Sequence, residues 1–541
     1  MFKFLLFIIK SIIVIIIQQV LLVIKDGVID YFKDKNSSYK LFSALLISYY
    51  LTIFFMYVPI DFNVLNDIFI PELLLFVFLI GLLLILILYK KSVSTDKELR
   101  DLCEVGFVAT FYLFLLYLFS LFCIHFIHIE VHFFDFTFVN DYYVIFKFNF
   151  YYIFDVYTTI SKSLVVLCFL INLYFMKYSY CFNLYKRLSV EYIPLLGFAV
   201  VIGCLAISSN DLFIIFILFE IISFLLIYLL VINFNSASIE AAIKFFFLNS
   251  FVGALGFIGI LIFYLINGFF STNLDVLASV LSINNTTGFN SNFLLDNTFY
   301  LKIACFLIFL NFFFKFGVFP VHIFVVDVYS ALSMSSIFFI STTLKLVYTF
   351  IFIKLIYYCF GSFMFLFSPV ILFISVITYA LGIFGAYNET NIKKFLAYSS
   401  VSHAGFMLFG LGGIDTAYNL AFTLFYFTIY IFSSILLFSV ILGYIDFKNN
   451  NEILNNFNDF YLLNYSISSK KFYSAKVYIL NNFFITISIL ALMGLPPVIG
   501  FVAKYFIFFN LFTAGYHFLV FVSLLFSVLS GVYYFSLILN I

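Results

Sequence analysis

The chain has 541 residues, of which 65% are hydrophobic and only 10% are charged, and its formal net charge is +1. Soluble domains carry about 25% charged residues, so this composition excludes an ordinary soluble protein, and the near-neutral charge argues against a nucleic-acid partner. The seven cysteines are scattered singly without a C-x-x-C motif, which favours neither an iron–sulfur cluster nor a disulfide framework. The composition therefore predicts an all-α polytopic membrane protein surrounded by lipid.

A membrane-spanning helix needs about 20 apolar residues. By this rule the sequence predicts about fifteen spans, at 3–24, 41–60, 69–90, 104–127, 154–176, 190–208, 210–232, 239–265, 299–331, 335–356, 366–387, 395–412, 416–445, 478–510 and 516–539. With alternating sides, nearly all lysines and arginines of the connecting loops fall on one side, and Lys3 and Lys147 are the exceptions. The positive-inside rule then places the N-terminus outside and the C-terminus inside.

Two of these spans carry a lysine beside a predicted helix break. The span 299–331 contains Lys315 and Pro320, and the span 478–510 contains Pro496 and Pro497 before Lys504. Proline interrupts the helical hydrogen-bond ladder, and a broken helix at membrane depth is tolerated only where protein or water satisfies the freed groups. A charge at such a break indicates an ion path. The alternative is a lysine that snorkels from a kinked helix.

Two further ionisable groups lie near the middle of apolar spans, Glu220 in 210–232 and Lys345 in 335–356. Lys244 lies nearer the inner end of its span, where snorkelling and proton relay are equally good interpretations. The remaining lysines of the spans can reach an interface by snorkelling: Lys10, Lys162, Lys302 and Lys354. Three carboxylates begin helices, where they complement the helix dipole: Glu72, Asp211 and Glu240.

A row of buried lysines with one carboxylate suits proton transfer. Burial disfavours the charged form of a lysine and a nearby carboxylate favours it again, so moving the carboxylate makes the lysine take up or release a proton. A merely structural buried ion pair is the alternative, because removing one partner of any such pair is costly.

The histidines give weaker signals. His322 follows the Pro320 break and His403 lies in the run AYSSVSHAGF, and each is either a proton relay or a hydrogen-bonded core residue. An outer cluster reads as an interfacial polar rim rather than a zinc site: His125, His128, Glu130 and His132. We therefore predict no metal site and, without a G-x-G-x-x-G or Walker A motif, no nucleotide site in this chain.

Several ordered motifs resemble subunit 2 (subunit N in bacteria) of the proton-pumping NADH:ubiquinone oxidoreductase, respiratory complex I. The resemblance covers about residue 71 to the C-terminus and rests on Asn210-Asp211-Leu212 with Phe219-Glu220, Glu240-Ala-Ala-Ile-Lys244, Phe314 to His322 with Asp327-Val328-Tyr329, Thr343-Leu344-Lys345, NIKKFLAYSSVSHAG from Asn391 to Gly405, and Gly494-Leu-Pro-Pro with Gly500-Phe-Val-Ala-Lys504.

This resemblance implies an antiporter-like fold with two inverted five-helix repeats, here 190–356 and 366–539, each containing a broken helix. Residues 69–189 would be the family's N-terminal helices, and 1–68 an extension with two spans that the family does not explain. The resemblance also assigns roles. Glu220 and Lys315 would form the input pair, Lys345 the bridge and Lys504 the terminal exchange site. The sequence itself contributes the two Pro-broken, Lys-bearing segments, which are typical of transporters built from repeats.

The resemblance further implies that this chain binds no cofactor and that NADH, FMN, iron–sulfur clusters and ubiquinone belong to partner subunits. Partners would be neighbouring antiporter-like and small membrane subunits. The AT-type composition, with 86 Phe and 40 Tyr, and the lack of an Arg/Ser-rich presequence favour the mitochondrial inner membrane, with the C-terminus in the matrix. A cation/proton antiporter subunit and a structural membrane subunit without transport are the alternatives.

Two departures from the family pattern stand out. The family's usual proline before Asp327 is Val326, and the chain ends where a fourteenth family helix would begin. Neither departure removes a residue of the expected relay.

Overall fold

The computed structural model describes residues 110, 146–148, 152–178, 189–232, 235–266, 272–278, 292–361, 364–413, 416–447, 472–496 and 498–540. The chain divides into two units, 1–63 with 76–91 and 64–75 with 92–541. The described residues all belong to the second. Three predicted spans lie outside them, and the fourth, 104–127, is described at Thr110 alone. The His125 to His132 cluster and Pro497 also lie outside.

The described part begins with a small antiparallel hairpin that the sequence did not predict. Strands β1, Phe146–Phe148, and β2, Tyr152–Phe154, pair with Lys147 opposite Ile153. Helix α5, Val156–Tyr178, follows directly. Tyr152 also bridges to Ser209 at the end of the next helix, so the hairpin is held against that end of the bundle.

Five helical passes follow. Asp211 begins the second pass, and its Oδ1 accepts a hydrogen bond of 2.8 Å from the Phe213 amide, as expected of an acidic N-cap. The passes are α6 (Ser189–Ser208), α7 (Leu212–Val231), α8 (Ser236–Ile266), α10 (Asn292–Phe316) with α11 (Ile323–Ala331), and α12 (Met334–Phe339) with the π-helix η2 (Ile340–Leu344) and α13 (Lys345–Tyr358).

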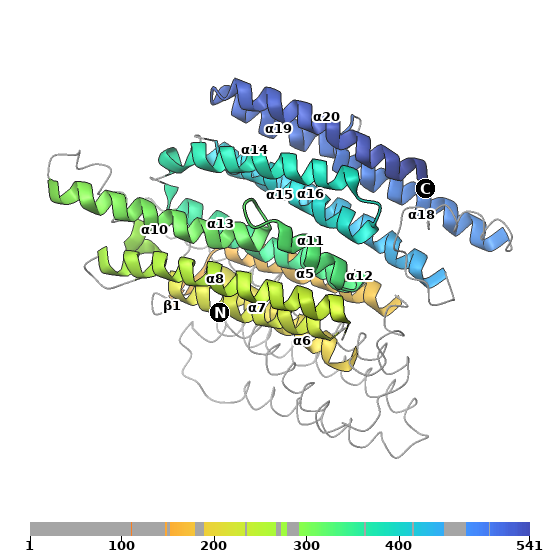
Figure 1. The fold of residues 1–541 in the computed structure, drawn as a ribbon, viewed down its shortest axis with the longest axis horizontal. Helices are drawn as coiled ribbons and strands as arrows, with labels where there is room; N and C mark the ends of the chain where they lie inside the picture. Colours follow the sequence, from red (N-terminus) through yellow and green to blue (C-terminus); the bar gives the residue numbers. More distant parts are fainter. Residues whose placement is uncertain are drawn as a thin grey trace, which may run out of the picture. The chain divides into compact units, whose positions relative to one another are not determined.

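Five more passes complete the chain. They are α14 (Met364–Asn388), α15 (Ile392–Leu411), α16 (Thr416–Phe447), α18 (Phe472–Met493) with α19 (Ile499–Thr513), and α20 (His517–Asn540). Figure 1 shows α6 to α13 on one side of the bundle and α14 to α20 on the other. The fourth pass is broken in each set of five, which confirms the predicted antiporter-like class of fold. Each predicted span from residue 154 onward corresponds to one of the helices described here.

Both breaks turn at a glycine with positive φ, which favours glycine because it has no Cβ. Gly317 has φ +72° and Gly494 has φ +74°. The first break joins Phe316 to Ile323 and the second joins Met493 to Ile499. The proline-and-glycine pattern therefore predicted the position of both breaks.

Helix α15 forms the centre of the second set and is buried along nearly its whole length. It packs very closely on α14 because glycines face each helix. A Cβ on Gly405 would lie 2.5 Å from Thr378 Oγ1, and a Cβ on Gly382 would lie 2.5 Å from the Ser402 amide nitrogen. This contact fixes the depth and rotation of α15, which carries Ser400 and His403.

Candidate functional site

The first broken helix brings a carboxylate and an ammonium group to opposite ends of one amide. Lys315 on α10 donates a hydrogen bond of 2.7 Å to Asn249 Oδ1 on α8. The same amide donates from Nδ2 to Glu220 Oε2 on α7 at 2.7 Å. Within the described residues no ion pair of 4 Å or less joins Glu220 directly to Lys315. The predicted input pair thus meets through Asn249.

The Glu220 carboxylate is held on one oxygen. Ser223, one turn later on α7, donates to Oε2 at 3.2 Å, and Asn249 bonds the same oxygen. The other oxygen, Oε1, is buried and has no hydrogen-bond partner among the described residues. It lies against Gly253, where a Cβ would come within 2.8 Å. A glycine at this position of α8 therefore leaves the space that the carboxylate occupies.

Lys345 begins α13 directly after the π-helix η2. Its side chain is 6% exposed, and Nζ donates 3.0 Å to the backbone carbonyl of Ser400 on α15. The ammonium also lies 5.9 Å from the centre of the Tyr430 ring, within the range of a cation–π contact. Single-turn π-helices concentrate at functional sites, and this one adjoins the lysine near mid-span.

His403 lies buried on α15 between two tyrosines. Its Nδ1 is 2.7 Å from the Tyr426 hydroxyl and its Nε2 is 3.0 Å from the Tyr534 hydroxyl. Lys345 and Lys504 both lie within electrostatic range of the imidazole. A neutral imidazole with hydroxyls on both nitrogens can donate from one and accept on the other, so the ring connects α16 and α20.

Lys504 lies on α19 just past the second break and is 6% exposed. Nζ donates 2.7 Å to the Met493 carbonyl, the last residue of α18, and lies 5.7 Å from the Phe406 ring centre. An ammonium at a helix C-terminus is favourable to the dipole. The break frees a carbonyl and the lysine satisfies it. Pro496 is an exposed residue of the turn.

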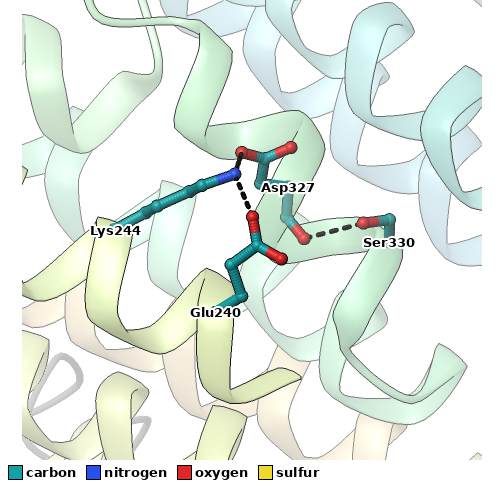
Figure 2. A network of polar contacts seen from close by, with 4 residues as sticks. All are labelled: Glu240, Lys244, Asp327 and Ser330. Atoms are coloured by element: carbon teal, nitrogen blue, oxygen red, sulfur yellow. Dashed lines mark hydrogen bonds and ion pairs between the residues drawn. The ribbon is translucent and has the colours of Figure 1, made fainter. Parts of the chain in front are cut away.

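Lys244 lies apart from this buried set, at the surface between α8 and α11 (Figure 2). Its Nζ lies 2.7 Å from Glu240 and 3.4 Å from Asp327, and the three side chains are 50%, 66% and 39% exposed. Figure 2 shows the lysine reaching from α8 toward α11 with both carboxylates around it. Of the two interpretations of Lys244, the geometry favours a surface group over a member of the buried relay.

His322 caps α11 at the Pro320 break without a side-chain cap bond. Its Nδ1 has no hydrogen-bond partner among the described residues, and its ring lies near Phe319, with centroids 6.4 Å apart. No described hydrogen bond joins His322 to Lys315. Its role in a relay therefore stays a prediction.

The snorkelling expectation was wrong for Lys162 and Lys354, which are each 1% exposed. Lys354 donates to the carbonyls of Ile207 at 3.0 Å and Ser209 at 2.6 Å. These carbonyls close the C-terminal end of α6, so they accept from an ammonium that would otherwise have to reach water. Lys302 is exposed, as expected.

Sequence reasoning also missed Asn249, Tyr426 and Tyr534. A neutral Asn or a Tyr in an apolar helix does not by itself indicate a functional site, because its role depends on which polar group the facing helix offers it. Among the described residues no group of three or more His, Cys, Asp or Glu side chains is arranged to hold a metal.

The fold and these buried charges define a polytopic membrane protein of the broken-helix, antiporter-like class. The sequence profile described as NADH:quinone oxidoreductase/Mrp antiporter, TM, matches residues 209–530. The chain belongs to this family, and the predicted resemblance is confirmed.

Relatives of known sequence agree with this. The chain is 30% identical over 352 residues to NADH-quinone oxidoreductase subunit N of Ruthia magnifica, covering 64% of this chain and 67% of that protein. It is 26% identical over 388 residues to subunit N of Rickettsia felis, covering 70% and 77%. The matches to the first relatives thus span about two thirds of their lengths.

Solved structures share the fold at lower identity. A chain of respiratory complex I from Thermus thermophilus with bound Aureothin is similar with a TM-score of 0.62 and 19% identity, covering 87% of this chain and 89% of that one. A chain of the Mrp complex from Dietzia sp. DQ12-45-1b is similar with a TM-score of 0.63 and 16% identity, covering 88% and 80%. Both likenesses concern the architecture of the bundle.

Proposed function

We propose that this chain translocates protons as a membrane-arm subunit of NADH:quinone oxidoreductase, respiratory complex I. The observation that carries the proposal is the part-buried Glu220–Asn249–Lys315 arrangement beside the first helix break. A mid-membrane ionisable residue costs a few kcal/mol, about 2.5–3.5 on insertion scales, and the chain places several of them in its interior. The names of its curated relatives supply the complex in which they would act.

In the proposed relay, Glu220 and Lys315 form the input pair, Lys345 the bridge and Lys504 the terminal exchange site. Protonation of the Glu220 carboxylate would remove the negative charge that faces Lys315 through Asn249. The Lys315 ammonium would then bind its proton less tightly and release it. His403, held between Tyr426 and Tyr534, would carry protons between the levels of Lys345 and Lys504.

The pKa changes open to a buried lysine are large enough to move a proton against a membrane potential. Moving a proton against roughly 170 mV costs about 4 kcal/mol, which corresponds to about three pKa units at 1.36 kcal/mol each. The pKa values of buried lysines vary over about that range.

The two sets of five helices, 190–356 and 366–539, would be the two inverted repeats, each supplying one lysine at its break.

The redox chemistry would belong to partner subunits, which would hold NADH, FMN, iron–sulfur clusters and ubiquinone. Neighbouring antiporter-like and small membrane subunits would be the direct contacts. The mitochondrial inner membrane and a matrix C-terminus stay predictions of composition and loop charge, because the relatives compared here are bacterial.

A cation/proton antiporter subunit is the second candidate, favoured by the likeness to a chain of the Mrp complex. Co-purification with NADH dehydrogenase activity separates the two. Within the assembled complex, Lys315→Met should abolish coupled proton pumping and leave assembly intact, because methionine keeps the shape of the stem and removes the proton carrier. Normal pumping by this variant would refute the relay.

A further inference from the structure

The first step of the proposed relay beyond the input pair has no described hydrogen bond. Glu220 meets Lys315 through an amide, and Lys345 bonds to α15, but no described hydrogen bond joins the two groups. Tyr348 is a candidate carrier for this step. It is one turn after Lys345 on α13, so the two side chains share a face of the helix, and its ring packs edge-on against Phe219 of α7 with centroids 5.3 Å apart.

The Tyr348 hydroxyl is buried without a protein partner. The side chain is 4% exposed, and its oxygen has no hydrogen-bond partner among the described residues. Glu220 Oε1 is also buried without a hydrogen-bond partner among the described residues. The Glu220 carboxylate lies close enough to the Tyr348 hydroxyl to interact with it electrostatically. Buried polar groups are nearly always paired with protein or ordered water, so ordered water is the expected partner of these two oxygens.

A third unpartnered atom lies on the side of α8 that faces Glu220. Asn311 Oδ1 on α10 is buried without a described partner, and its side chain lies against Gly256 of α8, one turn after the Gly253 that faces Glu220 Oε1. A water needs two to four polar partners to be held, and unpartnered oxygens of α7, α10 and α13 are candidates for that role.

A hydroxyl at this position does nothing for the fold that a phenylalanine would not do. The ring contact with Phe219 needs no oxygen, and an unsatisfied buried hydroxyl costs roughly 1–3 kcal/mol. We propose that the Tyr348 hydroxyl passes protons between Glu220 and Lys345 through ordered water. This inference rests on the proposed function and adds a carrier for the step between Glu220 and Lys345.

The transfer balances without any other reactant. The Glu220 carboxylic acid gives up a proton and becomes a carboxylate. The Tyr348 hydroxyl receives a proton from the water on that side as it releases its own to the water on the other. Neutral Lys345 takes up the proton and becomes an ammonium, and the phenol ends unchanged.

Tyr348→Phe in the assembled complex tests the step, because it removes only the oxygen. The complex is reconstituted into liposomes, and the initial rate of proton uptake is followed with a pH-gradient dye beside the uncoupled NADH:quinone reductase rate. We expect proton uptake to fall about a hundredfold, the lower end of the range for loss of one positioned proton-transfer group. Assembly and thermal stability should be unchanged or improved.

Tyr157→Phe is the matched control. Its hydroxyl donates 2.7 Å to the Phe350 carbonyl on the same helix α13, so this variant loses a real hydrogen bond away from the relay. We expect a lower thermal stability and normal proton uptake. Normal uptake by Tyr348→Phe, or a loss of uptake that merely follows a loss of assembled complex, overturns the inference.

Lys315→Met distinguishes this failure from failure of the proposed function. If Lys315→Met stops uptake and Tyr348→Phe does not, the relay stands and the Tyr348 step is wrong. If both variants pump normally, the proposed function fails and the Tyr348 step fails with it.

Discussion

Lys315 donates its 2.7 Å hydrogen bond to the amide oxygen of Asn249 and not to a carboxylate. The opposite end of that amide binds Glu220, so the polarity of one side chain matches an ammonium on one side and a carboxylate on the other. A direct contact between opposite charges in a low-dielectric interior would hold the lysine proton firmly. The amide spacer keeps the two charges coupled but apart.

Replacing this spacer should therefore impair pumping more than folding. Asn249→Leu keeps the approximate volume and removes the hydrogen bonds to Lys315, Glu220 and Ser223. Hydrogen bonds to charged groups are worth about 1.5–3 kcal/mol each, and about 1.4 kcal/mol is a factor of ten, so we expect proton uptake to fall roughly tenfold or more. Asn249→Gln keeps the amide and should retain more activity. Equal uptake in all three proteins would show that the amide has no part in the relay.

Gly253→Ala should separate stability from function. Alanine in a helix interior is favoured over glycine by about 1 kcal/mol, but its Cβ would lie 2.8 Å from Glu220 Oε1 and must displace the carboxylate. We expect unchanged or higher thermal stability with slower proton uptake. Gly531→Ala is the control, since its nearest neighbour would be 3.8 Å away. If Gly253→Ala pumps as well as Gly531→Ala, the position of the carboxylate does not matter.

Lys345 and Lys354 lie on the same helix and should respond differently to methionine. The Lys354 ammonium donates to two carbonyls at the end of α6. Lys354→Met should therefore lower the free energy of unfolding by roughly 1.5–3 kcal/mol. Pumping per assembled complex should stay intact. Lys345→Met should abolish pumping with a smaller loss of assembly. Native gels and proton uptake on the same membranes measure both. The reverse pattern would move the bridge of the relay to Lys354.

Gly494→Ala tests the second break. A left-handed backbone costs an L-residue roughly 1–2 kcal/mol, and the new Cβ would lie 2.7 Å from Lys504 Cδ. Gly515 has φ +88° with nothing within 4 Å of a Cβ, so Gly515→Ala carries the backbone cost alone. We expect similar losses in thermal stability and slower proton uptake only in Gly494→Ala. Matching uptake in the two variants would show that Lys504 tolerates displacement.

The membrane class follows from the composition, and the broken helices and the charged candidates could be predicted because each depends on a few residues within one apolar run. A lysine or glutamate in lipid costs energy wherever its neighbours lie, and proline breaks a ladder whatever faces it. Lys315, Lys345, Lys504 and Glu220 therefore stand out in the linear chain.

The sequence by itself determined that Glu220, Lys315, Lys345 and Lys504 lie within apolar helices, and where the helices break. Only the tertiary structure decided which of them meet. It placed Asn249 between Glu220 and Lys315, buried Lys354 against the end of α6, and left Lys244 on the surface. The physical reason is that insertion cost belongs to one residue and its depth, whereas hydrogen-bond satisfaction depends on the helix that packs against it.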